Sequence, residues 1–178
     1  MAIPTFNAVG FCAHYSKQGD WAFNLALELS KAHNVRLNVF HFLTDPFDPD
    51  DLSVQNLSRS ELEKLAVKEE KKLRLYYDEL AGEYIDVGFR VCYDKSWTEL
   101  HRCLVIREFQ ILVLGYIEKG VYFASKPIEE FADSFISPVI LVGPDNPDQL
   151  FLNSRAVLIA DNLGLNKEKL HKSKIVYI

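Results

Sequence analysis

The sequence predicts an α/β protein with a doubly wound, five-stranded parallel sheet, followed by a C-terminal extension that carries further strands. Short apolar runs of strand length alternate along the chain with longer segments whose apolar residues recur at helical spacing. Parallel strands need a helical crossover between them, and the intervening segments supply it. The five predicted strands fall in residues 7–13, 35–43, 84–93, 110–115 and 138–143.

The first crossover is predicted to be a helix over residues 20–32. Trp21, Leu25 and Leu29 recur there at helical spacing and form an apolar stripe. Asp20 can cap this helix, because its carboxylate can accept hydrogen bonds from the free amides of the first turn.

A turn-rich loop with two prolines, residues 44–56, precedes a long predicted helix. Ser60 and Glu63 have the spacing of a capping box at its start, and Gly82 suits the left-handed turn that ends it. The stripe that this helix buries is predicted to consist of Leu62, Leu65, Ala66, Leu73, Tyr76, Tyr77 and Leu80.

Two shorter helices complete the predicted core. Ser96 and Glu99 form a second capping-box pattern, which opens a helix before the fourth strand. Pro127 suits the first turn of a helix over residues 127–135, where no amide hydrogen is needed. The aromatic residues of the helices are predicted to lie in the core: Trp21, Trp97, Phe109, Phe131 and Phe135.

We expect one domain over residues 1–143 and an extension over residues 144–178. Within the extension, residues 156–161 and 174–178 are apolar runs that predict strands, with a short helical turn at 166–171 between them. These strands would extend a sheet edge or pair across a dimer, because an exposed apolar edge invites aggregation.

Composition limits the classes of partner. A net charge of −5 over 178 residues provides no basic field for nucleic acid, and no apolar run reaches the length of a membrane span. Cys12, Cys92 and Cys103 are odd in number, far apart and set in apolar segments, which favours reduced thiols and a cytoplasmic location.

From residue 7 to residue 142, the order of elements resembles the universal stress protein family. A serine-containing loop leads into an alanine-rich helix in "AHYSKQGDWAFNLALELS", and "ILVLG" is followed, after a loop and a helix, by "SPVILVG". This resemblance implies a fold of the adenine nucleotide alpha hydrolase type. It also implies a homodimer, formed through the strand Pro138–Val142 or through the extension.

Members of that family that bind ATP have a loop of the form G-x2-G-x9-G-S/T after the fourth strand, in which backbone amides approach phosphate oxygens. Here Gly115 stands for the glycine that ends the strand, whereas Gly120 does not fall at the family's spacing. Ser125 and Lys126 take the place of the final pair, which keeps a hydroxyl, adds a cation and loses the glycine.

In the first loop, Ser16 matches the family's serine, and His14 stands where the family has an aspartate. The resemblance implies that His14 would contact phosphate or ribose, that Lys126 would neutralise phosphate, and that Phe42 or Leu43 would border adenine. The candidate cleft for ATP or AMP thus contains Ala13, His14, Ser16, Phe42, Leu43, Gly115, Tyr116, Gly120, Ser125 and Lys126.

Bulky residues in this loop argue against the usual mode of binding. Glu118 would place a carboxylate beside phosphate, where like charges repel. Tyr116, Tyr122 and Phe123 have three candidate roles: they plug the phosphate cleft, stack on a base, or form a partner surface. The first hypothesis is a non-catalytic, dimeric regulatory protein with reduced or lost ATP binding; the second is an adenine-nucleotide binder with a rearranged cleft and slow hydrolysis.

Three other kinds of site fit the sequence poorly. The spacing of Gly115 and Gly120 matches a phosphate-binding P-loop, but the lysine and hydroxyl residue that this motif needs are missing. Cys12, His14 and His41 lack a fourth ligand for a metal and an acid that would support thiol catalysis. Asp94 follows the third strand as a phosphoacceptor would, without the acidic pair that holds magnesium. No catalytic residue is assigned.

Overall fold

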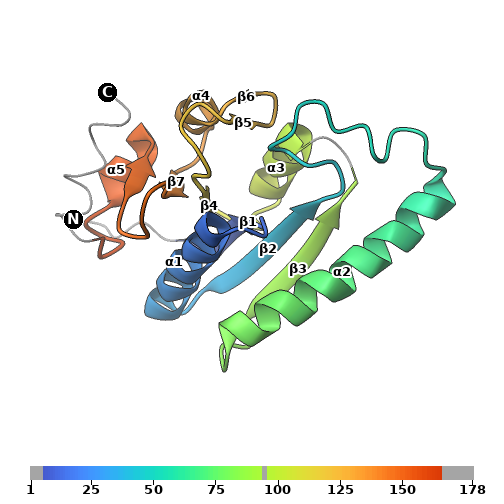
Figure 1. Cartoon of the computed structure of the whole chain (residues 1–178). Coiled ribbons are helices and arrows are strands. Elements are labelled where there is room, and N and C mark those ends of the chain that lie inside the picture. The colour runs from blue at the N-terminus through green and yellow to red at the C-terminus, as the bar shows by residue number, and fades with distance from the viewer. Residues whose placement is uncertain (1–5, 94–95, 166–178) are drawn as a thin grey trace.

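The computed structural model describes residues 6–93 and 96–165 (Figure 1). The strands are β1 (Ala8–Cys12), β2 (Arg36–Phe42), β3 (Val87–Cys92), β4 (Ile111–Gly115), β5 (Tyr122–Phe123), β6 (Lys126–Pro127), β7 (Val139–Val142) and β8 (Leu150–Leu152). The helices are α1 (Lys17–His33), α2 (Arg59–Ala81), α3 (Ser96–Val105), α4 (Ile128–Ser134) and α5 (Ser154–Ile159).

The main sheet has six strands in the order β3-β2-β1-β4-β7-β8. The first five are parallel, so the predicted doubly wound sheet is confirmed, and β8 adds an antiparallel strand beside β7. The order reverses at β1, from which the chain runs to β2 and β3 on one side and later returns to β4 on the other. Ligands bind such sheets outside the carboxyl ends of the strands at this reversal.

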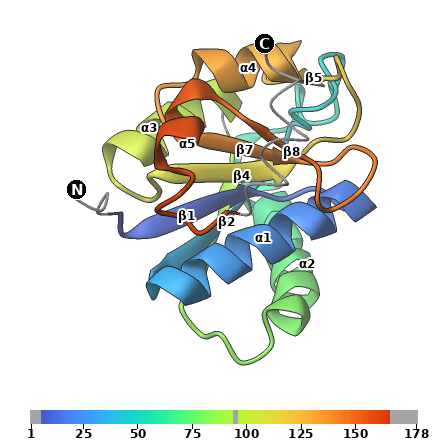
Figure 2. The same cartoon turned by 90° about the vertical axis from the view of Figure 1, so that its left-hand side faces the viewer.

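Helices cover both faces of the sheet, with α1 and α2 on one side and α3 and α4 on the other (Figure 2). Alternate residues of each strand point to opposite faces, so Phe11 packs against α1 and α2 while Cys12 faces α3. Five aromatic residues are predicted to lie in the core. Phe109, Phe131 and Phe135 are buried beneath α3 and α4, and Trp97 packs against the same core cluster. The fifth, Trp21, is partly buried against the other core.

Both predicted helix caps of the N-terminal half are wrong by a few residues. Ser16 caps α1, and its Oγ accepts a hydrogen bond of 2.9 Å from the Gly19 amide. Asp20 instead accepts a hydrogen bond of 2.8 Å from the Tyr76 hydroxyl, which ties α1 to α2.

In α2, the capping box consists of Ser58 and Glu61 rather than Ser60 and Glu63. The segment "SRSELE" contains the capping-box spacing twice, and the helix begins at the earlier copy. Of the predicted stripe, Ala66, Leu73 and Tyr77 are buried, Leu62, Leu65 and Tyr76 are half-buried, and Leu80 is exposed.

The extension differs from the prediction. Residues 156–161 do not form a strand, because α5 occupies most of that segment, and the strand that joins the sheet is β8. Asn153 fixes this arrangement: its Oδ1 accepts hydrogen bonds of 3.0 Å from the amides of Val139 and Ala156, which lie in β7 and α5. Its Nδ2 donates to the carbonyl oxygens of Ala132 and Ser137.

This pairing bears on the expected dimer. β7 lies between β4 and β8, so the strand Pro138–Val142 has no free edge for a second copy of the chain. Dimerisation through the extension stays a prediction. Predictions for Asp94, for residues 166–171 and 174–178, and for the side chain of Ser96 fall outside the described part of the chain. In that described part, no helix has the length and apolarity to cross a membrane.

Candidate ligand site

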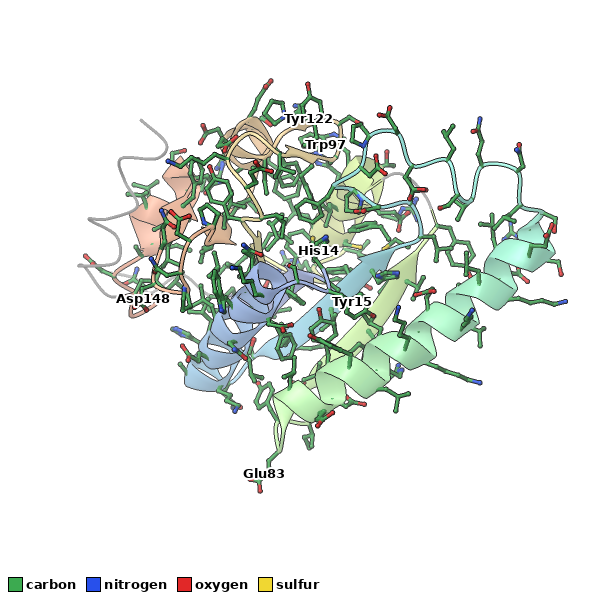
Figure 3. The ribbon with its side chains drawn as sticks, in the orientation of Figure 1. His14, Tyr15, Glu83, Trp97, Tyr122 and Asp148 are labelled. Atoms are coloured by element: carbon green, nitrogen blue, oxygen red, sulfur yellow. The ribbon has the colours of Figure 1, made fainter. Side chains whose placement is uncertain are left out.

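A half-enclosed pocket of about 530 Å³ opens at the carboxyl ends of β1 and β2, beside α2. We call it the β1–β2 pocket. His14 and Tyr15, which follow β1, form part of its wall (Figure 3). Its other lining residues are Ala13, His41, Phe42, Leu43, Asp45, Pro46, Ser53, Val54, Leu65 and Glu69.

His14 is held by the start of α1. Its Nδ1 lies 2.8 Å from Ser16 Oγ, the same hydroxyl that caps the helix, so the cap also orients the imidazole. Burial lowers the pKa of His14 although Asp45 acts in the opposite direction, so the ring is neutral at pH 7. Ser16 therefore serves the pocket indirectly, through His14, and does not line it.

Two carboxylates face the same space. The Glu69 carboxylate on α2 lies 3.6 Å from His41 Nε2 on β2, with both side chains about one-fifth exposed. Burial lowers the pKa of His41, and the charge of Lys72 lowers it further, while Glu69 and Asp45 oppose that shift. With both histidines neutral, Asp45 and Glu69 give the lining a negative charge.

Side chains of the protein itself fill the space inside the loop after β4. Tyr116 is only 1% exposed, and its hydroxyl donates a hydrogen bond to Glu129 Oε2. The amide of Gly120 donates to the same oxygen at 2.8 Å. Glu129 lies in the first turn of α4, where a negative charge is favoured. A carboxylate of the chain thus occupies the place that a phosphate would need beside Gly120.

Other backbone amides of this loop also donate hydrogen bonds to carbonyl oxygens of the chain. Val121 donates to the Glu118 carbonyl at 3.2 Å, and Ile128 donates to the Val121 carbonyl at 2.7 Å. Ala124 donates to the carbonyl of Pro46 at 2.9 Å, which joins the β5–β6 turn to the loop after β2. Phosphate binding by backbone requires amides that point at the ligand, whereas the amides of Gly120, Val121, Ala124 and Ile128 donate hydrogen bonds within the chain.

A row of rings separates the loop from the β1–β2 pocket. Phe47 lies edge-to-face against His14, with ring centroids 4.6 Å apart, and also against Phe123 at 5.0 Å. Phe123 is fully buried and contacts Phe131 at 4.6 Å. Tyr116 and Phe123 are buried as the plugging role requires, whereas Tyr122 is 45% exposed and does not plug the cleft.

Ser125 and Lys126 line a different pocket, together with Asp45, Asp48 and Asp51. The Lys126 ammonium lies 4.5 Å from the centroid of the Trp97 ring and 3.3 Å from Ser134 Oγ. Lys126 thus stacks on an aromatic ring within a mostly acidic surface.

The ten predicted cleft residues are therefore divided. Ala13, His14, Phe42 and Leu43 come together in the β1–β2 pocket. Gly115 is explained by packing and not by a ligand. A side chain at this position would place its Cβ 2.9 Å from the Gly19 amide nitrogen, so glycine lets β4 approach α1 closely.

Sequence analysis missed Glu69, Asp45, Tyr15, Phe47 and Glu129. Glu69 carried a detectable signal, since it lies four residues after Leu65 on the stripe that α2 turns inward. An acid within an apolar stripe points to a polar cavity. Tyr15 and Asp45 follow the carboxyl ends of β1 and β2, the position that also predicts His14 and Leu43. Phe47 and Glu129 depend on packing between distant segments, which spacing does not reveal.

The cysteines show no sign of a reactive site. All three are buried and free, and burial raises the pKa of Cys12 and Cys92 strongly and that of Cys103 to about 12. A protonated buried thiol is a poor nucleophile. Among the described residues, no group of three or more histidine, cysteine or acidic side chains has the geometry of a metal site.

No protein-family model matches the chain, and no curated protein sequence does. Solved structures do match. Universal stress protein UspA from Lactobacillus plantarum gives a TM-score of 0.55 at 14% identity, over 79% of this chain and 99% of that one. A universal stress protein in complex with cAMP gives a TM-score of 0.50 at 14% identity, over 79% of this chain and 99% of that one. A hypothetical protein, PH0823, gives a TM-score of 0.52 at 16% identity, over 77% of this chain and 95% of that one.

Identities this low establish a common fold. The expected element order and its resemblance are confirmed at that level, over about four-fifths of the chain. The chain has the universal stress protein fold.

Proposed function

We propose that this chain is a non-catalytic, cytoplasmic regulatory protein of the universal-stress type in which binding of nucleoside triphosphates is reduced or lost. The observation that carries the proposal is the use of the loop amides. Gly120, Ala124 and Ile128 all donate hydrogen bonds within the chain, and Glu129 supplies the negative charge. A triphosphate would have to displace these contacts and would meet a carboxylate.

Calorimetric titration and thermal unfolding with ATP, with and without magnesium, test this proposal. A ligand at a hundred times its dissociation constant stabilises the folded state by about 2.7 kcal/mol, which raises the melting temperature by several degrees in a domain of this size. We expect no such rise with millimolar ATP. Saturable ATP binding with a micromolar dissociation constant would contradict the proposal.

A second candidate function is binding of an adenine nucleotide with few charges. The structure with cAMP among the similar proteins favours it. A base would border Ala13, Phe42 and Leu43 in the β1–β2 pocket, with His14 near the ribose. AMP and cAMP therefore belong in the same titration: stabilisation by either, without stabilisation by ATP, selects this function.

Self-association is proposed to use the extension. The resemblance implies a homodimer, and β8 is the outermost strand of the described sheet beside β7. On α5, Leu158 is 83% exposed and Val157 45% exposed, which leaves an apolar surface next to that edge.

Light scattering tests the dimer. We expect twice the chain mass of 20.4 kDa, and a fall towards the monomer mass for Leu158→Glu. Leu75→Glu is the matched control, because Leu75 is 77% exposed on α2 and outside the proposed contact. A monomer at all concentrations, or equal effects of the two variants, would rule out this contact.

A further inference from the structure

The charge of the β1–β2 pocket does not suit an anion. Its lining contains two carboxylates, Asp45 and Glu69, and no lysine or arginine. Burial favours the neutral form of His14 and His41, so neither ring compensates this charge near pH 7. Lys72 on α2 does not line the pocket, but it lies close enough to act on His41, so it offsets part of the negative charge. A phosphate in this pocket would be repelled mainly by Glu69, which is half-buried, and more weakly by Asp45, which is exposed to solvent.

The carboxylates converge from two segments. Glu69 reaches inward from α2 to within 3.6 Å of His41 Nε2. Asp45, in the loop after β2, also lines the pocket, and its charge acts to raise the pKa of both His14 and His41. Its Oδ1 also accepts a hydrogen bond of 2.9 Å from the Phe47 amide, which holds the side chain in place. The pocket therefore presents two fixed acceptors to one ligand.

The remaining walls suit a flat apolar body. Phe42 and Leu43 are 4% and 8% exposed at the end of β2, and Leu65 and Val54 close the side towards α2. Tyr15 adds a ring to the wall, but the Lys72 ammonium already lies 4.9 Å from its centroid, so Tyr15 would contact the body of a ligand and not its cationic group. A volume of about 530 Å³ is within the range of pockets that bind small molecules.

We propose that the β1–β2 pocket binds a small organic cation: a flat apolar or aromatic body that carries a protonated amidine, guanidine or amine group. The cationic group would donate hydrogen bonds to Glu69 and Asp45, and the body would lie against Phe42, Leu43 and Tyr15. This inference concerns a different part of the molecule from the loop after β4, so it stands or falls separately from the loss of triphosphate binding. It competes with the second candidate function, which places an adenine nucleotide in the same pocket, so binding of AMP or cAMP there would count against it.

The test uses three probes of the same shape and different charge: benzamidine, benzamide and benzoate. Hydrogen bonds to charged groups contribute more than neutral ones, so benzamidine should bind about tenfold more tightly than benzamide. Benzoate should bind more weakly than either. Calorimetry or ligand-detected NMR on the full chain measures the three dissociation constants.

Glu69→Gln should weaken benzamidine by about tenfold and leave benzamide unchanged, because only the cation uses the charge. Glu79→Gln is the matched control: it makes the same change on the exposed surface of α2 and should alter neither. Asp45→Asn gives a second test, since the amide oxygen can still accept from the Phe47 amide. Circular dichroism checks that each variant is folded.

Equal dissociation constants for benzamidine and benzamide, the tightest binding by benzoate, or no binding of benzamidine at millimolar concentration would each overturn the inference. So would a loss of benzamidine affinity in Glu79→Gln as large as in Glu69→Gln. A separate titration with ATP reports on the loop: ATP binding would overturn the proposed function, whatever the benzamidine series shows.

Discussion

The β1–β2 pocket and the loop after β4 lie at the same edge of the sheet, at the carboxyl ends of neighbouring strands, but they differ in what fills them. The pocket is an open space with two carboxylates and neutral histidines on its walls. In the loop, Tyr116 and Phe123 are buried, and Glu129 binds the Gly120 amide.

This difference shows how one sheet edge can be open on one side and filled on the other. A parallel sheet with a reversal of strand order leaves a crevice at the reversal, whatever its side chains. The crevice stays open where charged groups line it, as at Glu69, because burying a charge without a partner is costly. It closes where apolar rings can meet, as Phe47 and Phe123 do.

The largest effect on stability is expected for Phe123, whose ring fills the side of the crevice next to the loop after β4. Phe123→Ala removes a fully buried ring that contacts Phe131 and Phe47, and large-to-small changes of this kind cost about 3–5 kcal/mol of unfolding free energy. Urea unfolding followed by circular dichroism measures the loss.

Tyr122→Ala is the control for that prediction. Tyr122 is next to Phe123 in β5 but is 45% exposed, so its removal should cost less than about 1 kcal/mol. Similar losses for the two variants would mean that the ring of Phe123 does not fill the cleft, and the contrast between the two regions would fail.

The predictable part of this structure is its local part. Strands such as β4 (Ile111–Gly115) are predictable because their residues are apolar on both sides, and this pattern needs no knowledge of neighbours. The predicted start of α2 is two residues late because "SRSELE" contains the capping-box spacing twice. Spacing alone does not choose between two valid starts.

The remaining features depend on contacts between distant segments. The run that includes Val157 and Leu158 is too short for its periodicity to separate a strand from a helix, although Asn153 before it is a typical helix cap. The division of the predicted cleft arises because Ala124 bonds to Pro46, 78 positions earlier in the chain. Among the ten predicted cleft residues, those that directly follow β1 or end β2 and its turn do meet in one pocket.

A smaller effect is expected for the Glu129 carboxylate, which accepts hydrogen bonds from the Tyr116 hydroxyl and the Gly120 amide. Glu129→Gln keeps an oxygen for the Tyr116 hydroxyl and the Gly120 amide but removes the charge, which should cost about 1 kcal/mol. Glu130→Gln makes the same change in the same turn of α4, where the side chain is exposed, so it controls for the charge at the helix N-terminus. Amide hydrogen exchange at Gly120 should become faster in the first variant only, because its acceptor is weaker. Equal destabilisation by the two variants, with unchanged exchange at Gly120, would show that Glu129 acts only through the helix dipole and does not hold the loop closed.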